Sequence, residues 1–243
     1  MEEPVLFTVR EDFSLGSSSN AWGPVNVNAD WNVLVANGKT LNVYGALNSS
    51  GRTITVGGEG FSGTLVLNNA ANASMTAEWV ITSGSTVRCM NNSALGSGLV
   101  TLDGGTLDFN SQTIGSTITL NMSGTGTLQN VTVDGAILSY TSSSGNDGIT
   151  ASNTTWTSGK IDIGRLLQGF SAEGSNTVDL GAELGEGFTV LGLERGQYSI
   201  EGRVLMIKDV AISRVTWVSA GAGGALEETV KNAFTLALGE GSA

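Results

Sequence analysis

Carboxylates are the only side chains in this sequence that are well suited to hydrolytic chemistry. The chain has 243 residues with no histidine and one cysteine. Neither a Ser-His-Asp nor a Cys-His nucleophile can therefore form, and no metal can be held by histidine. In the central region acidic residues are few. The most conspicuous are Asp103, Asp108, Asp134, Asp147 and Asp162.

Two of these aspartates precede glycine in matching contexts. They are Leu102-Asp103-Gly104-Gly105 and Val133-Asp134-Gly135-Ala136. Both resemble the hydrophobic-Asp-Thr/Ser-Gly loops of aspartic peptidases, although neither has the Thr or Ser. Asp-Gly is also a common short corner, so the same residues are equally typical of turns without chemistry.

Stacking of carboxylates would give them a catalytic role. Neighbouring strands lie about 4.8 Å apart, so two stacked carboxylates would repel and one pKa would rise. Such a pair could share a proton and activate water, or serve as the acid and nucleophile of a retaining glycosidase at about 5 to 5.5 Å. These carboxylates would make the protein a carboxylate-dependent hydrolase, either an aspartic-type protease or a glycosidase acting on glycoprotein such as mucin. Its candidate catalytic residues are Asp103, Asp108 and Asp134.

Other chemistry has less support in the sequence. A Ser-Lys dyad would need Lys39, Lys160 or Lys208 as its base, and no spacing selects one of them. Cys89 lies in a strand-like run and is predicted to be a small buried apolar residue, since no imidazole could activate it. The run Asn146-Asp147-Gly148 lacks the pattern of a calcium loop and is expected to be a surface loop. The sequence therefore predicts no metal site and no cofactor.

The elements that must position these residues are short strands joined at glycine corners. Residues 94–107 read A-L-G-S-G-L-V-T-L-D-G-G-T-L. This pattern predicts a strand over 99–102, a corner at Gly104-Gly105 and a second strand from Thr106. Branched apolar residues at alternate positions indicate one buried face. Similar runs recur roughly every 10 to 14 residues, many as Thr-Φ-Thr/Asn-Φ, where Φ is aliphatic.

We expect an all-β chain folded as a right-handed parallel β-helix over residues 25–165, with aliphatic stacks inside and Thr or Asn ladders outside. A β-sandwich is the alternative. Residues 1–24 are expected to form an N-terminal cap or loose segment, and 166–243 a small C-terminal α+β cap. This cap would contain a hairpin over 198–207, turning at Glu201-Gly202, and an amphipathic helix over 226–238. The helix is expected to seal the end of the stack, with binding to a partner as the alternative.

The repeat at residues 94–107 resembles the autotransporter-associated β-strand repeat of bacterial passenger proteins. The resemblance implies a parallel β-helix exported to a cell surface and implies no single activity, because passengers include adhesins, proteases and passive stalks. On this basis we expect a secreted or surface protein whose signal peptide has been removed. Met1-Glu2-Glu3-Pro4 lacks the basic and then apolar pattern of such a signal.

Charge narrows the range of partners. The net charge of −11 and a pI near 4.3 would repel a phosphate backbone, so nucleic acid is excluded. No segment is long and apolar enough to predict a membrane span. The expected function is contact with an extracellular glycan or glycoprotein as an adhesin-like or structural module, with the carboxylate-dependent hydrolase as the alternative. The sequence does not indicate an oligomeric state.

Overall fold

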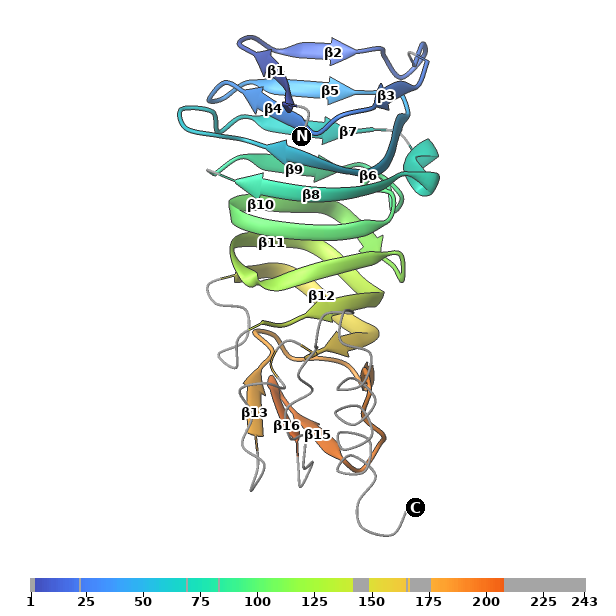
Figure 1. Ribbon diagram of the computed structural model, residues 1–243, viewed down its shortest axis with the longest axis vertical. Coiled ribbons are helices and arrows are strands. Elements are labelled where there is room, and N and C mark those ends of the chain that lie inside the picture. Colours follow the sequence, from blue (N-terminus) through green and yellow to red (C-terminus); the bar gives the residue numbers. More distant parts are fainter. Residues whose placement is uncertain are drawn as a thin grey trace, which may run out of the picture.

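The computed structural model describes residues 3–21, 23–68, 70–82, 84–141, 149–164, 166 and 176–207. In these residues the chain winds into a right-handed parallel β-helix whose coils stack along one long axis, as predicted (Figure 1). All strand pairings between coils are parallel throughout the described part of residues 40–135. The β-sandwich alternative is therefore wrong.

The coils have three faces, and strands on one face pair with those of the neighbouring coils. The first face carries β1 (Val5–Val9), β4 (Trp31–Val35), β8 (Thr76–Thr82) and β14 (Gly187–Val190). The second carries β2 (Phe13–Leu15), β5 (Thr40–Val43), β7 (Thr64–Leu67) and β9 (Thr86–Cys89). The third begins with β3 (Val25–Val27). Four longer strands bend around corners and contribute to more than one face: β6 (Leu47–Val56), β10 (Gly98–Ile114), β11 (Ile118–Ser139) and β12 (Ile149–Asp162).

The interior is a set of apolar stacks, because inward positions of one coil lie directly above inward positions of the next. On the first face one stack runs through Trp31, Ile54, Trp79, Val100 and Leu120, whose successive members are 20 to 25 residues apart. All but the first are almost completely buried. Each such side chain contributes about 1.5–3 kcal/mol by leaving water, so a continuous stack is the main source of stability.

A ladder of threonines runs along the outside of the second face. Its members occupy one register position in successive coils: Thr40, Thr64, Thr86, Thr106, Thr127 and Thr150. Most are half-buried. The β-branched side chain suits an extended backbone and its hydroxyl remains in water. This confirms the outward threonine ladder predicted from the Thr-Φ-x-Φ pattern.

The corner between the first and second faces of the β10 coil lies at the predicted glycine pair. Gly104 has φ of +78°, in the left-handed region that glycine enters without strain. Gly105 packs so closely on the preceding coil that a Cβ there would lie 2.6 Å from the carbonyl oxygen of Ile81. Both glycines are therefore needed, one for conformation and one for space.

The stack begins earlier than the predicted boundary at residue 25. Strand β1 pairs in parallel with β4, and β2 pairs in parallel with β5, so part of segment 1–24 is built as a coil of the solenoid. This first coil has one neighbour, and Leu6 and Phe13 on it are 62% and 47% exposed. Phe7 is partly buried and stacks on Trp31, with ring centroids 6.4 Å apart.

At the C-terminal end the parallel stack gives way to an antiparallel sheet of β13 (Asn176–Asp179), β16 (Val204–Ile207) and β15 (Tyr198–Glu201). The predicted hairpin is confirmed, but its turn lies one residue later than the expected Glu201-Gly202: the two-residue loop is Gly202 and Arg203, with Gly202 at φ +60°. The buried Tyr140 hydroxyl donates to the Leu180 carbonyl at 2.8 Å and joins this sheet to the last coils. The predicted helix at 226–238 lies outside the described residues.

One coil replaces its third-face strand with the short 3-10 helix η1 (Ala70–Ser74). Asn72 within η1 is 1% exposed and supplies the missing links between coils. Its Oδ1 accepts from the Leu47 amide at 2.7 Å, and its Nδ2 donates to the Ala94 carbonyl at 2.8 Å. A single side chain thus connects three consecutive coils where no strand can.

Replacing Asn72 by alanine should destabilise the solenoid without changing its outline. The substitution leaves the Leu47 amide and Ala94 carbonyl buried and unpaired, each costing about 1–3 kcal/mol. We expect the free energy of unfolding to fall by about 2–4 kcal/mol, measured by urea denaturation, since the structure can relax around part of the loss. Asn20→Ala, at an exposed position, is the control and should change stability by less than about 0.5 kcal/mol. An equally small effect of both variants would contradict the role of Asn72 in connecting three coils.

Candidate functional site

The three aspartates selected from the sequence lie near three different corners of the coil. Asp103 follows the first-face segment of β10, where the chain turns toward the second face. Asp108 lies near the end of the second-face segment of the same coil. Asp134 follows the third-face segment of β11, one coil further on. The structure therefore does not bring them together.

None of these aspartates is paired with another carboxylate in the sheet register. Asp103 is exposed and lies opposite Thr82 and Thr125. Asp134 is exposed, lies opposite Ser158 and accepts a hydrogen bond from its hydroxyl. The proton-sharing pair that stacked carboxylates would form is absent at these positions.

Asp108 is buried and serves the structure. Its Oδ2 accepts from Arg88 Nε at 3.0 Å, and its Oδ1 accepts from the Asn110 amide at 2.9 Å and from Asn130 Nδ2 at 3.0 Å. Burial by itself raises the pKa of this carboxyl, but the hydrogen bonds from Asn130, the Asn110 amide, Arg88 and Gln129 outweigh it and leave the pKa below its usual value. The carboxylate is thus held ionised, with its oxygens turned toward the corner.

An asparagine ladder at the same corner continues this network. Asn130 and Asn153 have φ of +54° and +52°, in the left-handed region that asparagine tolerates better than most residues. Asn153 Nδ2 donates to Asn130 Oδ1 at 2.9 Å, and Asn130 in turn reaches Asp108. The sequence predicted outward Thr or Asn ladders, but neither the position of this one at a corner nor its link to Asp108. The sequence feature that could have indicated it is an asparagine immediately after the second-face segments of both β11 and β12.

Two of the other candidate nucleophiles and bases, Cys89 and Lys39, are poorly placed for catalysis. Cys89 is completely buried, and burial followed by the nearby Asp108 charge raises the pKa of its thiol well above the usual value. This confirms it as a buried apolar side chain. Lys39 Nζ pairs with Glu11 at 2.7 Å, which raises its pKa, so it is a poor general base. Lys160 is exposed on β12. Lys208 and the loop 146–148 lie outside the described residues.

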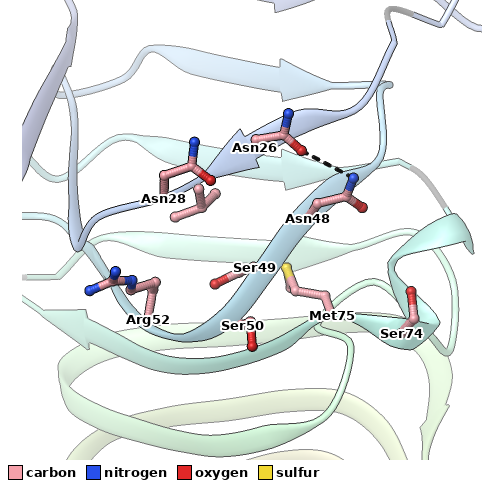
Figure 2. Close-up of a pocket in the computed structure, with 9 residues that line it drawn as sticks. Asn26, Asn28, Asn48, Ser49, Ser50, Arg52, Ser74 and Met75 are labelled. Atoms are coloured by element: carbon pink, nitrogen blue, oxygen red, sulfur yellow. Dashed lines mark hydrogen bonds between the residues drawn. The ribbon is translucent and has the colours of Figure 1, made fainter.

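A polar groove of about 440 Å³ crosses the third face of the first coils and was not predicted. Figure 2 shows most of its side chains coming from β3, above, and the adjacent β6, below, with Ser74 and Met75 contributed by the end of η1 and the residue after it. It is lined by amide, hydroxyl and guanidinium side chains, together with Val27 and Met75; the polar members are Asn26, Asn28, Asn48, Ser49, Ser50, Arg52 and Ser74. No carboxylate of the described residues lines it.

Strand pairing fixes the positions of these groups. Asn26 lies opposite Asn48 in the register, and Asn48 Nδ2 donates to Asn26 Oδ1 at 3.2 Å. Ser49 Oγ is buried and has no hydrogen-bond partner among the described residues. At Gly51, with φ of +62°, β6 turns from the third face to the first, and this corner presents Arg52 to the groove. The result is a fixed row of donors and acceptors suited to a hydroxyl-rich ligand.

Comparison with known proteins adds no further assignment. The chain matches no protein-family model, no curated protein and no solved structure. In the part of the chain that the structure describes, no three acidic or thiol side chains gather into a metal-binding cluster. No helix among those residues is long and apolar enough to cross a membrane.

Asp108→Asn tests the structural role assigned to this carboxylate. At neutral pH the variant should lose about 1–3 kcal/mol of stability, because its amide cannot accept every bond that the carboxylate accepts. The folded-state pKa of Asp108 is lowered, so its contribution is present above the unfolded pKa of about 3.9 and is lost as pH falls through the folded value. The stability gap between wild type and variant should therefore shrink below about pH 4. Urea denaturation at several pH values measures this gap. Asp103→Asn, at an exposed position outside the network, is the control. If Asp108→Asn lost no more stability than Asp103→Asn at neutral pH, the structural role of Asp108 would be refuted.

The thiol of Cys89 should be unreactive in the folded protein. Its burial and raised pKa keep it protonated and out of contact with solvent at pH 7. A disulfide reagent such as dithionitrobenzoate should label it more than a hundredfold faster in denaturant than in buffer. Rapid labelling of the native protein would mean that the β9 stack opens readily.

Proposed function

We propose that this protein is a secreted or cell-surface β-helix module that binds an extracellular glycan or glycoprotein through the groove on its third face. The observation that carries the proposal is the row of asparagine and serine side chains on β3 and β6, held in register by strand pairing. Sugars present closely spaced hydroxyls, each a donor and an acceptor. Amides and hydroxyls on a rigid sheet complement these hydroxyls and lose little conformational entropy on binding.

The composition of the groove supports binding rather than hydrolysis. Hydrolysis of a glycosidic bond by two carboxylates needs both of them beside the bond. The groove has no carboxylate in its lining, and Asp103, Asp108 and Asp134 lie near separate corners outside it. The hydrolase alternative therefore has no assembled site in the described residues.

The location follows from surface chemistry and from the resemblance of residues 94–107 to passenger repeats. The chain carries 22 acidic and 11 basic residues, and its outward positions are rich in Thr, Asn and Ser. Such a surface keeps a long solenoid soluble outside the cell. A stack of coils also presents the groove at one end of an extended scaffold, which suits contact with a matrix or a neighbouring cell.

Binding to a glycan and mucin array tests the proposal, with Asn48→Ala as the diagnostic variant. This substitution removes an exposed amide from the groove and should weaken glycan binding about three- to tenfold, the usual effect of one lost hydrogen bond. Asn42→Ala removes an outward amide from the second face instead and should leave affinity unchanged. If the protein bound no glycan, the proposal would fail and a passive spacer would remain. If both variants weakened binding equally, the binding site would not be this groove.

A further inference from the structure

Building on the proposed function, we propose that the groove recognises a carboxylated sugar, a uronic or sialic-acid residue within a mostly neutral glycan, and that Arg52 binds its carboxylate. Among the described residues, Arg52 is the only charged one that lines the groove, in a chain whose net charge is −11. A cation among neutral amides and hydroxyls provides one specific position for an anion.

Arg52 is free to bind a ligand. It is exposed, and it forms no ion pair with any described residue, whereas Lys39, Arg88 and Arg203 each pair with a carboxylate. It lies immediately after the Gly51 corner and is one of the residues that line the groove. Figure 2 shows its guanidinium on the same side of the groove as Asn28.

The carboxylates closest to Arg52 in the register do not neutralise it. Asp30 lies at the end of the first coil, and its Oδ1 accepts from the Thr53 amide at 3.0 Å. Glu78 lies opposite Thr53 in the next coil. Neither lines the groove or forms an ion pair with Arg52 within 4.0 Å. Their negative charges would repel a ligand that brings several anionic groups close to Arg52.

This balance favours one isolated carboxylate over a dense polyanion. The guanidinium fork matches a carboxylate with two parallel hydrogen bonds. A heavily sulfated or phosphorylated chain would meet one favourable cation and the repulsion of an acidic protein around it.

Matched ligand pairs test the inference by titration calorimetry on the whole chain. The pairs are sialyllactose with lactose, and a glucuronate-containing oligosaccharide with its carboxyl-reduced form; sulfated lactose represents the other anion source. The wild type should bind the acidic member of at least one pair about tenfold or more tightly, as expected for a hydrogen bond to a charged group. Added salt should reduce this preference.

Variants at Arg52 assign the preference to one side chain. Arg52→Gln should remove the acid preference and leave the neutral sugar bound as before, while Arg52→Lys should retain part of it because the charge remains without the fork. Arg10→Gln, at an exposed arginine on the first coil outside the groove, is the control and should bind as the wild type does. Equal affinity for both members of each pair, tighter binding of sulfated lactose, or an acid preference that survives Arg52→Gln would overturn the inference and leave glycan binding intact. No binding to any sugar here or on the array would overturn the proposed function itself.

Discussion

Parallel in-register stacking is the constraint on which the rest of this structure depends. Because each coil lies on the previous one with its strands hydrogen-bonded in register, a residue's surroundings are set by the residues at the same position one coil away. Aliphatic side chains thereby form continuous stacks, and threonines form an outer ladder. At a buried position a charged residue is tolerated only where its neighbours in the stack complement it. Asp108 meets this condition, since Arg88 lies opposite it in one coil and Gln129 in the other.

The sequence predicted much of the fold, because alternation with period two is a local property. The strands expected around Leu99–Leu102 and Thr106, the glycine corner between them and the hairpin at Glu201 all appear in the structure. The start of the solenoid was misplaced because a Ser-rich run separates β2 from β3 and reads as a loose segment. That run is an outward loop, and the strands before it follow the same alternation as the later coils.

The residues of the candidate site were much harder to predict, since their surroundings depend on which coil lies next to which. Successive stacked positions are 20 to 25 residues apart on the first face, so the partner of Asp108 cannot be found by counting a fixed repeat. The polar groove has the same difficulty. Its lining comes from three separate segments, around Asn28, Ser49 and Ser74, and it forms where the regular stack is interrupted by the Gly51 corner and η1. The groove therefore forms where the coil is irregular, and the periodicity of the sequence says least about such places.

The direction of the inter-coil hydrogen bonds has a mechanical consequence. In a stack of parallel coils these bonds point along the long axis of the molecule (Figure 1). Tension applied to a chain end along that axis peels the terminal coil from the next one. The hydrogen bonds between these two coils break before those of the other coils, so extension proceeds in steps of one coil. Shear across the axis loads every layer at once. A solenoid built this way would lengthen stepwise under axial load and stay stiff against a sideways load.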